Sequence, residues 1–299
     1  MTFRLVFTED PAEFLELAGE HLAADPVLNT VLATVATRAA RRADEDRPTP
    51  DHPEWWVTVL DGDTVVGVAM RTAPFRPYPL YVLPMPDEAA TQLGRAVVER
   101  GEVAPANGAL PAARLVSEEI ARLSRGTAAV TEHMRLFECR EVIRPVAPPG
   151  RLRLATPDDA ELCLAWYQAF EAAASEQAGR PHRLGGGEHF DAEFVAGRIA
   201  DGCIHLWETP GGEVVHLTAA NIPAFGVSRV GPVYTPTEHR GAGHASAAVA
   251  EVTQQILDSG VRACLFTDQA NPTSNRIYQA IGYQALVDMA NFSVTSSVS

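Results

Sequence analysis

Two stretches of alternating apolar and polar residues, one in each half of the chain, have the same layout around a glycine-containing turn. Residues 55–75 read WWVTVLDGDTVVGVAMRTAPF, in which two apolar runs flank Asp-Gly-Asp. Residues 203–225 read CIHLWETPGGEVVHLTAANIPAF and flank Pro-Gly-Gly in the same way. Alternating runs joined by such a turn predict a β-hairpin. We therefore expect one hairpin in each half.

The elements around the two hairpins also follow the same order. Each hairpin is preceded by alanine-rich helical sequence, Pro11–Arg42 and Pro157–Ala200, and is followed by a strand, a helix and further strands. This order predicts a duplicated α+β unit with a mixed sheet. The proline-rich stretch RPVAPPG at 144–150 predicts a linker. The expected division is a domain over 1–143, this linker, and a domain over 151–299.

Composition excludes several classes of function. The chain has 299 residues, 46% of them hydrophobic, which is enough to bury two cores. Its formal charge of −14 argues against nucleic acid or an anionic membrane surface as a partner and favours cationic small molecules. All 24 basic side chains are arginine. Schiff-base chemistry and lysine-dependent phosphate loops are therefore excluded.

The cysteines and the N-terminal residues bear on location. Four cysteines stand far apart among mostly apolar neighbours, which predicts buried free thiols: Cys139, Cys163, Cys203 and Cys264. The first residues, MTFRLVFTED, become charged too early for a signal-peptide core. No uncharged apolar run is long enough to span a bilayer. A cytoplasmic protein is expected.

A glycine turn leads into a predicted helix in the second half, where residues 238–252 read EHRGAGHASAAVAEV. Gly241 and Gly243 let the backbone approach a ligand without a Cβ atom in the way. The N–H groups of a first helical turn are unpaired and lie at the positive end of the helix dipole. Together with Arg240 they predict an anion site for a phosphate or diphosphate. The alternative is a turn that only joins strand to helix.

Two further observations bear on this turn. The matching segment of the first half, residues 80–101, reads LYVLPMPDEAATQLGRAVVERG and contains a strand and a helix but no glycine turn. Gly241-Ala-Gly243 followed by Ala245-Ser246 half-matches the dinucleotide fingerprint G-x-G-x-x-G. The third glycine is missing, however, and the segment follows a hairpin rather than a first strand. A nicotinamide-dependent enzyme is therefore the weaker alternative.

A second segment, residues 265–283, reads LFTDQANPTSNRIYQAIGY. It predicts the end of a buried strand, an Asn-Pro turn, a short helix opened by Thr273 or Ser274, and a stop at Gly282. The order of VYTP, RGAGHA, a helix, a strand ending in TD, and this segment resembles the GNAT N-acetyltransferases, which use acetyl-CoA. Their loop pattern Q/R-x-x-G-x-G/A is filled by Arg240, Gly243 and Ala245.

The resemblance is closest over residues 203–290, and in the first half it covers the hairpin and the element order. It implies an α+β fold of two tandem GNAT-like acyl-CoA N-acyltransferase domains, of which the first is a degenerate copy that lacks the pyrophosphate loop. The degenerate copy would shape the acceptor pocket or brace the fold. Such a protein would transfer an acetyl group by direct attack of an amine in a ternary complex.

The resemblance also implies the residues that bind the cosubstrate. One strand segment would pair with the pantetheine arm, the glycine turn would cradle the diphosphate, and an asparagine would bond near the amide arm. The implied acetyl-CoA-binding residues are Val233, Tyr234, Thr235, Arg240, Gly241, Ala242, Gly243, His244, Ala245, Ser246 and Asn271. Pro232 and Pro236 bracket the strand segment and predict that it is distorted. The alternatives are an ordinary edge strand and, for Asn271, a local turn role.

Tyr278 matches the tyrosine that the family is thought to use for protonating the departing thiolate of CoA. It could instead pack beside Ile277 and Ile281. Spacing identifies no general base, although Glu213, His216 and Asp268 lie on or beside the relevant strands. A covalent cysteine intermediate is not expected, because no cysteine has a histidine beside it in this region.

One cluster of polar residues outside these motifs could suggest a metal. Residues 181–194, PHRLGGGEHFDAEF, contain His182, Glu188, His189 and Asp191. Their spacing fits no closed ligand set, so we expect a mobile glycine loop near the substrate entrance and no metal.

The expected function is an N-acetyltransferase that uses acetyl-CoA and a primary amine on a small molecule or a peptide, with a cationic acceptor favoured by the acidity of the chain. The alternative is a non-catalytic acyl-CoA-binding protein that serves regulation or assembly. Tyr278 favours the enzyme, because binding alone does not require a proton donor.

Overall fold

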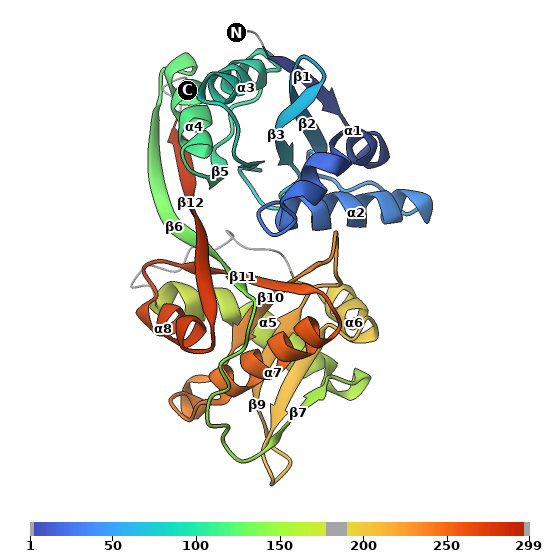
Figure 1. The fold of residues 1–299 in the computed structure, drawn as a ribbon, viewed down its shortest axis with the longest axis vertical. Coiled ribbons are helices and arrows are strands. Elements are labelled where there is room, and N and C mark those ends of the chain that lie inside the picture. The colour runs from blue at the N-terminus through green and yellow to red at the C-terminus, as the bar shows by residue number, and fades with distance from the viewer. Residues whose placement is uncertain (1–2, 178–189, 296–299) are drawn as a thin grey trace. The chain divides into compact units, whose positions relative to one another are not determined.

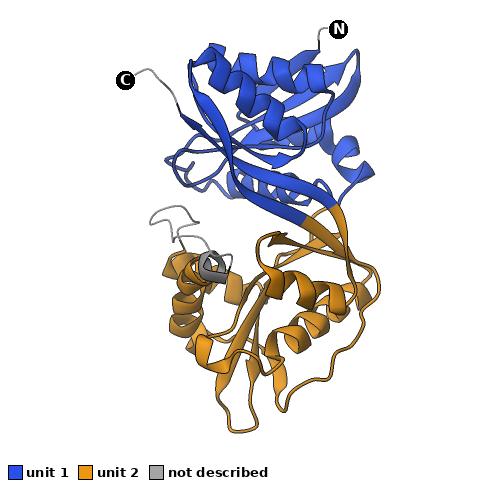
Figure 2. Ribbon diagram, turned by 90° about the vertical axis from the view of Figure 1, so that its left-hand side faces the viewer, with its two compact units in different colours: residues 1–135, 287–299 blue, residues 136–286 orange. Residues whose placement is uncertain are grey.

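The computed structural model describes residues 3–177 and 190–295, which form two compact units. Unit 1 comprises Met1–Arg135 with Val287–Ser299, and unit 2 comprises Leu136–Leu286 (Figure 2). The sequence predicted a change of domain at 144–150. Two long strands, β6 (Thr127–Cys139) and β12 (Tyr283–Thr295), each contribute residues to both units.

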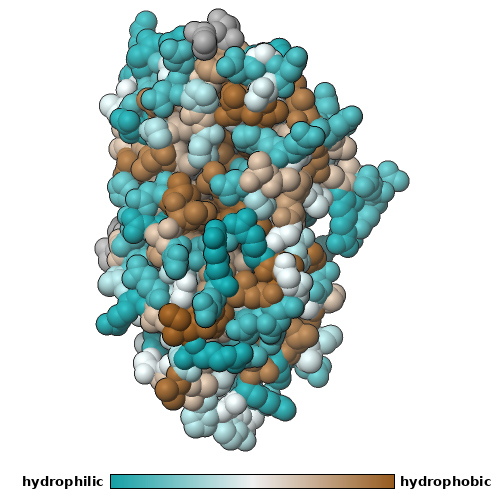
Figure 3. All heavy atoms as spheres, viewed as in Figure 1, coloured by the Kyte–Doolittle hydropathy of each residue, from teal (hydrophilic) through white to brown (hydrophobic). Residues whose placement is uncertain are grey.

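The strands of unit 1 lie in the order β1-β2-β3-β4-β5-β12-β6 in a mixed sheet (Figure 1). Asp10 caps the first helix by accepting hydrogen bonds from the backbone of Ala12 and Glu13. The projecting end of the second helix is hydrophilic (Figure 3), which agrees with its sequence RRAD. The elements are β1 (Arg4–Thr8), α1 (Pro11–Ala24), α2 (Thr30–Asp44), β2 (Trp55–Asp61), β3 (Thr64–Arg71), β4 (Leu80–Val82), α3 (Asp87–Glu99), β5 (Ala106–Ala109), α4 (Ala112–Leu123) and most of β6.

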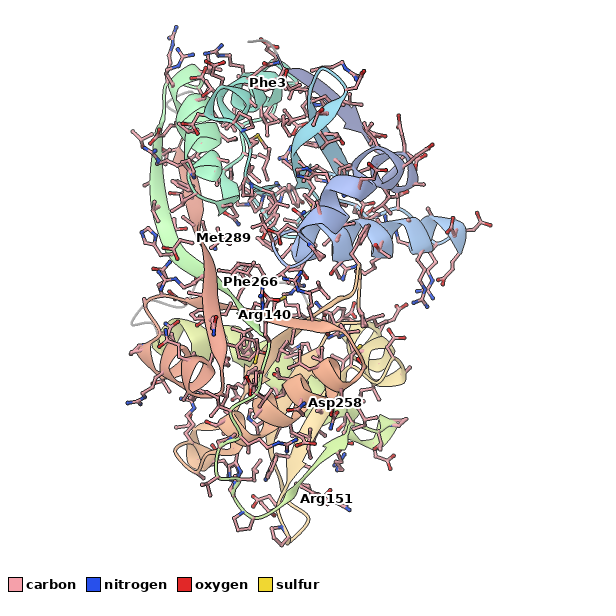
Figure 4. The ribbon with its side chains drawn as sticks, in the orientation of Figure 1. Phe3, Arg140, Arg151, Asp258, Phe266 and Met289 are labelled. Atoms are coloured by element: carbon pink, nitrogen blue, oxygen red, sulfur yellow. The ribbon has the colours of Figure 1, made fainter. Side chains whose placement is uncertain are left out.

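Unit 2 repeats this plan, and its strands lie in the order β6-β11-β10-β9-β8-β7. Helix α7 ends at Asp258, labelled in Figure 4, and Gly260 follows at the C′ position with φ 77°, as the sequence predicted. The elements are β7 (Arg151–Leu154), η1 (Pro157–Asp159), α5 (Ala160–Gln177), α6 (Ala192–Ala200), β8 (Ile204–Glu208), β9 (Val214–Ala220), β10 (Val227–Tyr234), η2 (Thr237–His239), α7 (His244–Asp258), β11 (Arg262–Asp268), α8 (Pro272–Ala280) and the start of β12.

The order of elements confirms the predicted duplication. Both expected hairpins are present as antiparallel pairs, β2 with β3 and β8 with β9. In each unit the hairpin follows two α-helices and precedes a strand, a helix, a strand, a helix and a long strand. The fold is therefore α+β, with two tandem copies of one mixed-sheet unit.

In each unit one strand lies beside a strand that is far away in the sequence. In unit 1, β12 pairs antiparallel with β5, and Met289, labelled in Figure 4, lies opposite Ala109. Ala290 and Phe292 from the same strand are buried in the core of unit 1. In unit 2, the end of β6 lies beside β11, where a carboxylate oxygen of Glu138 accepts a 2.8 Å hydrogen bond from Arg262.

The sheet of unit 2 is covered on both faces. Leu217 and Ala219 of β9 pack with residues of α5 and α6. Ala220, the next residue, packs in a cluster that contains Val249 of α7. Because successive side chains of a strand point to opposite faces, α7 covers one face and α5 with α6 the other.

The cysteines agree with the prediction from the sequence, since all four are free and buried. Among the described residues, no helix combines the length and the apolar composition needed to cross a lipid bilayer. Both units instead bury their apolar residues in their own cores.

Candidate functional site

The glycine turn of unit 2 adopts the conformation that only glycine adopts readily. Gly241 has φ 81° and Gly243 has φ 87°, both in the left-handed region. Gly243 is the N-cap residue of α7, and no side chain of the described chain caps this helix end. The first N–H groups of α7 therefore lack partners within the helix and carry the positive end of its dipole.

The space in front of this turn is open. A Cβ atom placed on Gly241 would meet nothing within 4 Å, and one on Gly243 would meet only Cδ of Pro148 at 4.0 Å. Nδ1 of His244 is buried and has no hydrogen-bond partner in the described part of the chain. Arg240 precedes the turn, and its Nε donates to the carbonyl oxygen of Thr235 at 3.0 Å. Unpaired donors beside open space are what an anionic group needs.

The strand that leads into this turn separates from its neighbour. Strands β10 and β11 pair in parallel over Val227–Arg229, with Arg262–Cys264 as their partners. β10 then continues to Tyr234 with β9 as its partner, and its register shifts between Val230 and Val233. This bulge lies where the prolines predicted a distorted strand. Beyond Arg229 the described residues show no pairing of β10 with β11, so backbone groups on that edge are available to an extended ligand.

The corresponding place in unit 1 is closed. All three residues of β4, Leu80–Val82, pair with β5. A Cβ atom on Gly108 would lie 1.9 Å from the carbonyl oxygen of Val82, so the two strands are in close contact. Helix α3 follows Pro86 directly and has Asp87 and Glu88 in its first turn. Their carboxylates oppose an anion at that helix end.

Asn271 caps a helix and is buried, with 5% of its surface exposed. Its side-chain oxygen accepts a 3.0 Å hydrogen bond from the backbone of Ser274. The prediction that Thr273 or Ser274 opens this helix was wrong, because α8 begins at Pro272 with Asn271 as its N-cap. Proline fits the first position of a helix, where no N–H partner is needed.

Tyr278 lies on α8 and is nearly buried, with 8% of its surface exposed. Its ring packs edge-on against Tyr283, with 6.1 Å between ring centroids, in a cluster that includes Ile281. Burial raises the pKa of Tyr278 to about 12, against the smaller opposing effect of a hydrogen bond with Ser274. The phenol is therefore protonated throughout the physiological pH range.

The three side chains considered as bases have different surroundings. The pKa of His216 is lowered to about 3, mainly by burial and further by His244, so its imidazole is neutral and a poor proton acceptor. The side chain of Glu213 is 65% exposed and lies 3.5 Å from His239. One oxygen of Asp268 accepts a 2.8 Å hydrogen bond from the backbone of Ala270. None of these surroundings identifies a general base.

The low pKa of His216 predicts sensitivity to acid. An unfolded chain protonates this histidine below its ordinary pKa of 6.5, whereas the folded chain resists protonation down to about 3. Above pH 6.5 this histidine does not reduce the free energy of unfolding. As the pH falls below 6.5, the free energy of unfolding decreases by up to about 1.4 kcal/mol per pH unit. Urea unfolding at pH 7, 6 and 5 should show that His216→Gln has a smaller loss than the wild type. Equal losses in the two proteins would contradict the assignment.

Of the residues considered for a metal, Asp191 has a structural role. It caps α6 by accepting a 2.8 Å hydrogen bond from the backbone of Phe194. His182, Glu188 and His189 lie outside the described residues. Within residues 3–177 and 190–295, no group of three or more suitable side chains could hold a metal ion.

The sequence did not predict which side chains surround Tyr234 and Thr235. The ring of Tyr234 packs against Trp166 of α5, with 5.8 Å between centroids. The hydroxyl of Thr235 is 2.7 Å from Nδ1 of His216. The sequence marked His216 only as a candidate base, and no local signal relates it to Thr235, which is 19 residues away.

Comparison with known proteins agrees with this architecture. Residues 211–292 match the model of a family described as FR47-like protein, and no curated protein sequence matches the chain. A solved structure of a Drosophila protein is 14% identical, covers 98% of both chains and has a TM-score of 0.63. A GCN5-related N-acetyltransferase from Sphaerobacter thermophilus is 18% identical, covers 98% of this chain and 95% of its own, and has a TM-score of 0.57.

A third structure has the same tandem organisation. It is described as a tandem GNAT protein from the clavulanic acid biosynthesis pathway, is 12% identical and has a TM-score of 0.56. The alignment covers 99% of this chain and 98% of that one. At these identities the likeness concerns the fold, and it extends over nearly the whole length of the chain.

Proposed function

We propose that this protein, which has the GNAT acyltransferase fold in two tandem copies, is an N-acetyltransferase that transfers the acetyl group of acetyl-CoA to a primary amine. Unit 2 would carry the reaction. The observation that supports this most directly is the open, uncapped N-terminus of α7 beside the end of β10 that has separated from β11. An anion site and an adjacent extended strand edge are what a ligand with a diphosphate and a peptide-like arm requires.

The diphosphate would be bound by the backbone N–H groups of Gly241, Ala242, Gly243, Ala245 and Ser246. Arg240 would add positive charge. His244, the first residue of α7, would lie at the same helix end. The glycine turn and the first turn of α7 already have this conformation without a ligand, so binding requires little reorganisation of the backbone.

The thioester would lie along the free edge of β10, where the backbone of Val233, Tyr234 and Thr235 orients the acetyl carbonyl. Asn271, at the N-terminus of α8, would bond near the amide arm, and its present bond to Ser274 already fixes its orientation. Holding the carbonyl in one orientation while donating to its oxygen lowers the barrier to attack.

In the reaction, the nitrogen lone pair of the neutral amine attacks the acetyl carbonyl carbon, and the carbon–sulfur bond breaks with its electron pair going to sulfur. Tyr278 would then deliver a proton to that sulfur. Burial keeps the pKa of Tyr278 at about 12, so the phenol carries its proton when the thiolate departs, and the same burial makes it a weaker acid than an exposed tyrosine. The nitrogen loses one proton to solvent, which leaves the neutral amide, and solvent returns a proton to Tyr278 after it has donated its own. The acceptor would be a small-molecule or peptide amine, with a cationic one favoured by the formal charge of −14.

Unit 1 would not bind acetyl-CoA. The paired β4 and β5 and the acidic first turn of α3 support this reading of the first copy as degenerate. The same proposal places the division between the domains at 144–150 and the protein in the cytoplasm. It includes neither nucleic acid nor a membrane as a partner.

A non-catalytic acyl-CoA-binding protein is the second candidate, and one observation favours it. Tyr278 is nearly buried against Tyr283, so it could serve packing alone. In that case the chain would bind acetyl-CoA without turnover.

Two measurements test these proposals. Calorimetry should show that acetyl-CoA binds to the wild-type chain and that NADH does not, and absence of heat with acetyl-CoA would overturn both candidates. Thiol release should then be followed with a panel of amines that contains polyamines, aminoglycosides and peptide N-termini. Release that depends on an amine supports the enzyme, whereas binding without release with any amine supports the second candidate.

A further inference from the structure

A buried pair of hydrogen bonds joins the sheet of unit 2 to the segment that carries the glycine turn. His216 lies on β9 with none of its surface exposed. Its Nδ1 is 2.7 Å from Oγ1 of Thr235, and its Nε2 is 2.7 Å from Oγ1 of Thr218. Both ring nitrogens are therefore satisfied inside the core, where an unpartnered polar atom would be costly.

The imidazole is suited to this role because it is neutral. A neutral ring has one N–H donor and one acceptor nitrogen, and a threonine hydroxyl can either donate or accept. Burial lowers the pKa of His216 to about 3, so this form persists over the physiological range.

The hydrogen bond between His216 and Thr235 lies just beyond the point where the backbone pairing of β9 and β10 ends. The last pair between β10 and β9 is Tyr234 with Leu217. Thr235 comes next and is followed by Pro236, which has no N–H to extend the ladder. The side chain of Thr235 is thus bound to His216, while its carbonyl oxygen accepts the hydrogen bond from Arg240 at 3.0 Å.

We infer that His216 is a positioning residue for the diphosphate site, which it influences through Thr235 without touching the ligand. By holding Thr235 against β9, it fixes where Arg240 and the first turn of α7 lie relative to the sheet. The inference rests on the proposed function and adds to it a residue of β9, the strand that pairs with β10. Val233 and Tyr234, which would meet the pantetheine arm along β10, are held by the backbone ladder with β9 and do not depend on this bridge.

The test compares CoA with pantetheine, which lacks the diphosphate together with the rest of the nucleotide. His216→Leu replaces the imidazole with an apolar side chain of similar reach and so removes both nitrogens. We expect the dissociation constant for CoA to rise about tenfold, while that for pantetheine, which has no phosphate, changes less than twofold. His216→Gln should restore most of the CoA affinity, because its amide can donate and accept.

A double variant tests the route through Thr235. If His216 acts through that hydroxyl, His216→Leu combined with Thr235→Val should bind CoA no more weakly than the weaker single variant. Additive losses would contradict the bridge. Thr253→Val is the matched control, because it removes a different buried hydrogen bond of α7, the 2.8 Å contact with the Tyr283 hydroxyl. It should lower stability and leave both affinities unchanged.

The outcomes separate this inference from the proposed function. A wild-type chain that does not bind CoA overturns the function and, with it, the inference. If the wild type binds CoA but His216→Leu binds it equally well, or loses CoA and pantetheine affinity to the same extent, only the positioning role is overturned. Selective loss of CoA affinity with rescue by glutamine supports both.

Discussion

Gly243→Ala is expected to weaken acetyl-CoA binding by roughly 10- to 100-fold, the effect of losing one charge-assisted hydrogen bond from the helix terminus. Gly243 has φ 87° and open space before it, so an alanine there would strain the left-handed backbone and place a methyl group where the diphosphate is proposed to lie. Relief of that strain would turn the N–H groups of the first turn away from the ligand. Calorimetric titration with acetyl-CoA measures the effect.

The same helix provides the control. Gly260 lies at the other end of α7 with φ 77°, and a Cβ atom there also meets nothing within 4 Å. Gly260→Ala therefore introduces the same backbone strain, worth about 1–2 kcal/mol, away from the proposed site. It should lower stability as much as Gly243→Ala and leave acetyl-CoA affinity unchanged. Equal affinities for the two variants would contradict the cradle.

Tyr278→Phe is expected to reduce kcat by at least about 100-fold with little change in acetyl-CoA affinity, if its hydroxyl delivers the proton to the CoA sulfur. The phenylalanine ring would keep the packing against Tyr283 and Ile281. Loss of the hydroxyl would leave the departing thiolate without a donor. Thiol release under saturating acetyl-CoA, with an amine that the panel identifies, provides the measurement.

Tyr283→Phe is the matched control for this change. Tyr283 is buried in the same cluster, and its hydroxyl is bonded to Thr253 rather than available to a ligand. Removing it should cost stability, because the Thr253 hydroxyl loses its partner, and should leave kcat unchanged. If the two variants retain the same kcat, Tyr278 serves packing, and the non-catalytic candidate gains support.

The conformation of the glycine turn could be predicted from the sequence, because the reasons for it are local. Two glycines before an alanine-rich helix indicate left-handed backbone at the helix entrance, and both have positive φ. The hairpins follow from alternation of period two around turn residues, and each is present. Repetition of the element order then indicated the duplication.

The cap of α8 shows where local reasoning fell short. Asn271, Thr273 and Ser274 are all good N-cap residues, and the prediction from the sequence named Thr273 or Ser274 instead of Asn271. The position of Pro272 settles the start of the helix, since proline is favoured in the first turn and Asn271 then precedes it.

The sequence by itself determined the elements, their repeated order and the shape of the turn at the mouth of α7, because these depend on residues within a few positions of one another. Only the tertiary structure decided which strands lie side by side, as when β12 pairs with β5 across about 180 residues, and which side chains are buried together, as with His216 and Thr235. Strand partners and burial depend on contacts between distant segments, and a strand's own pattern specifies only which face is apolar.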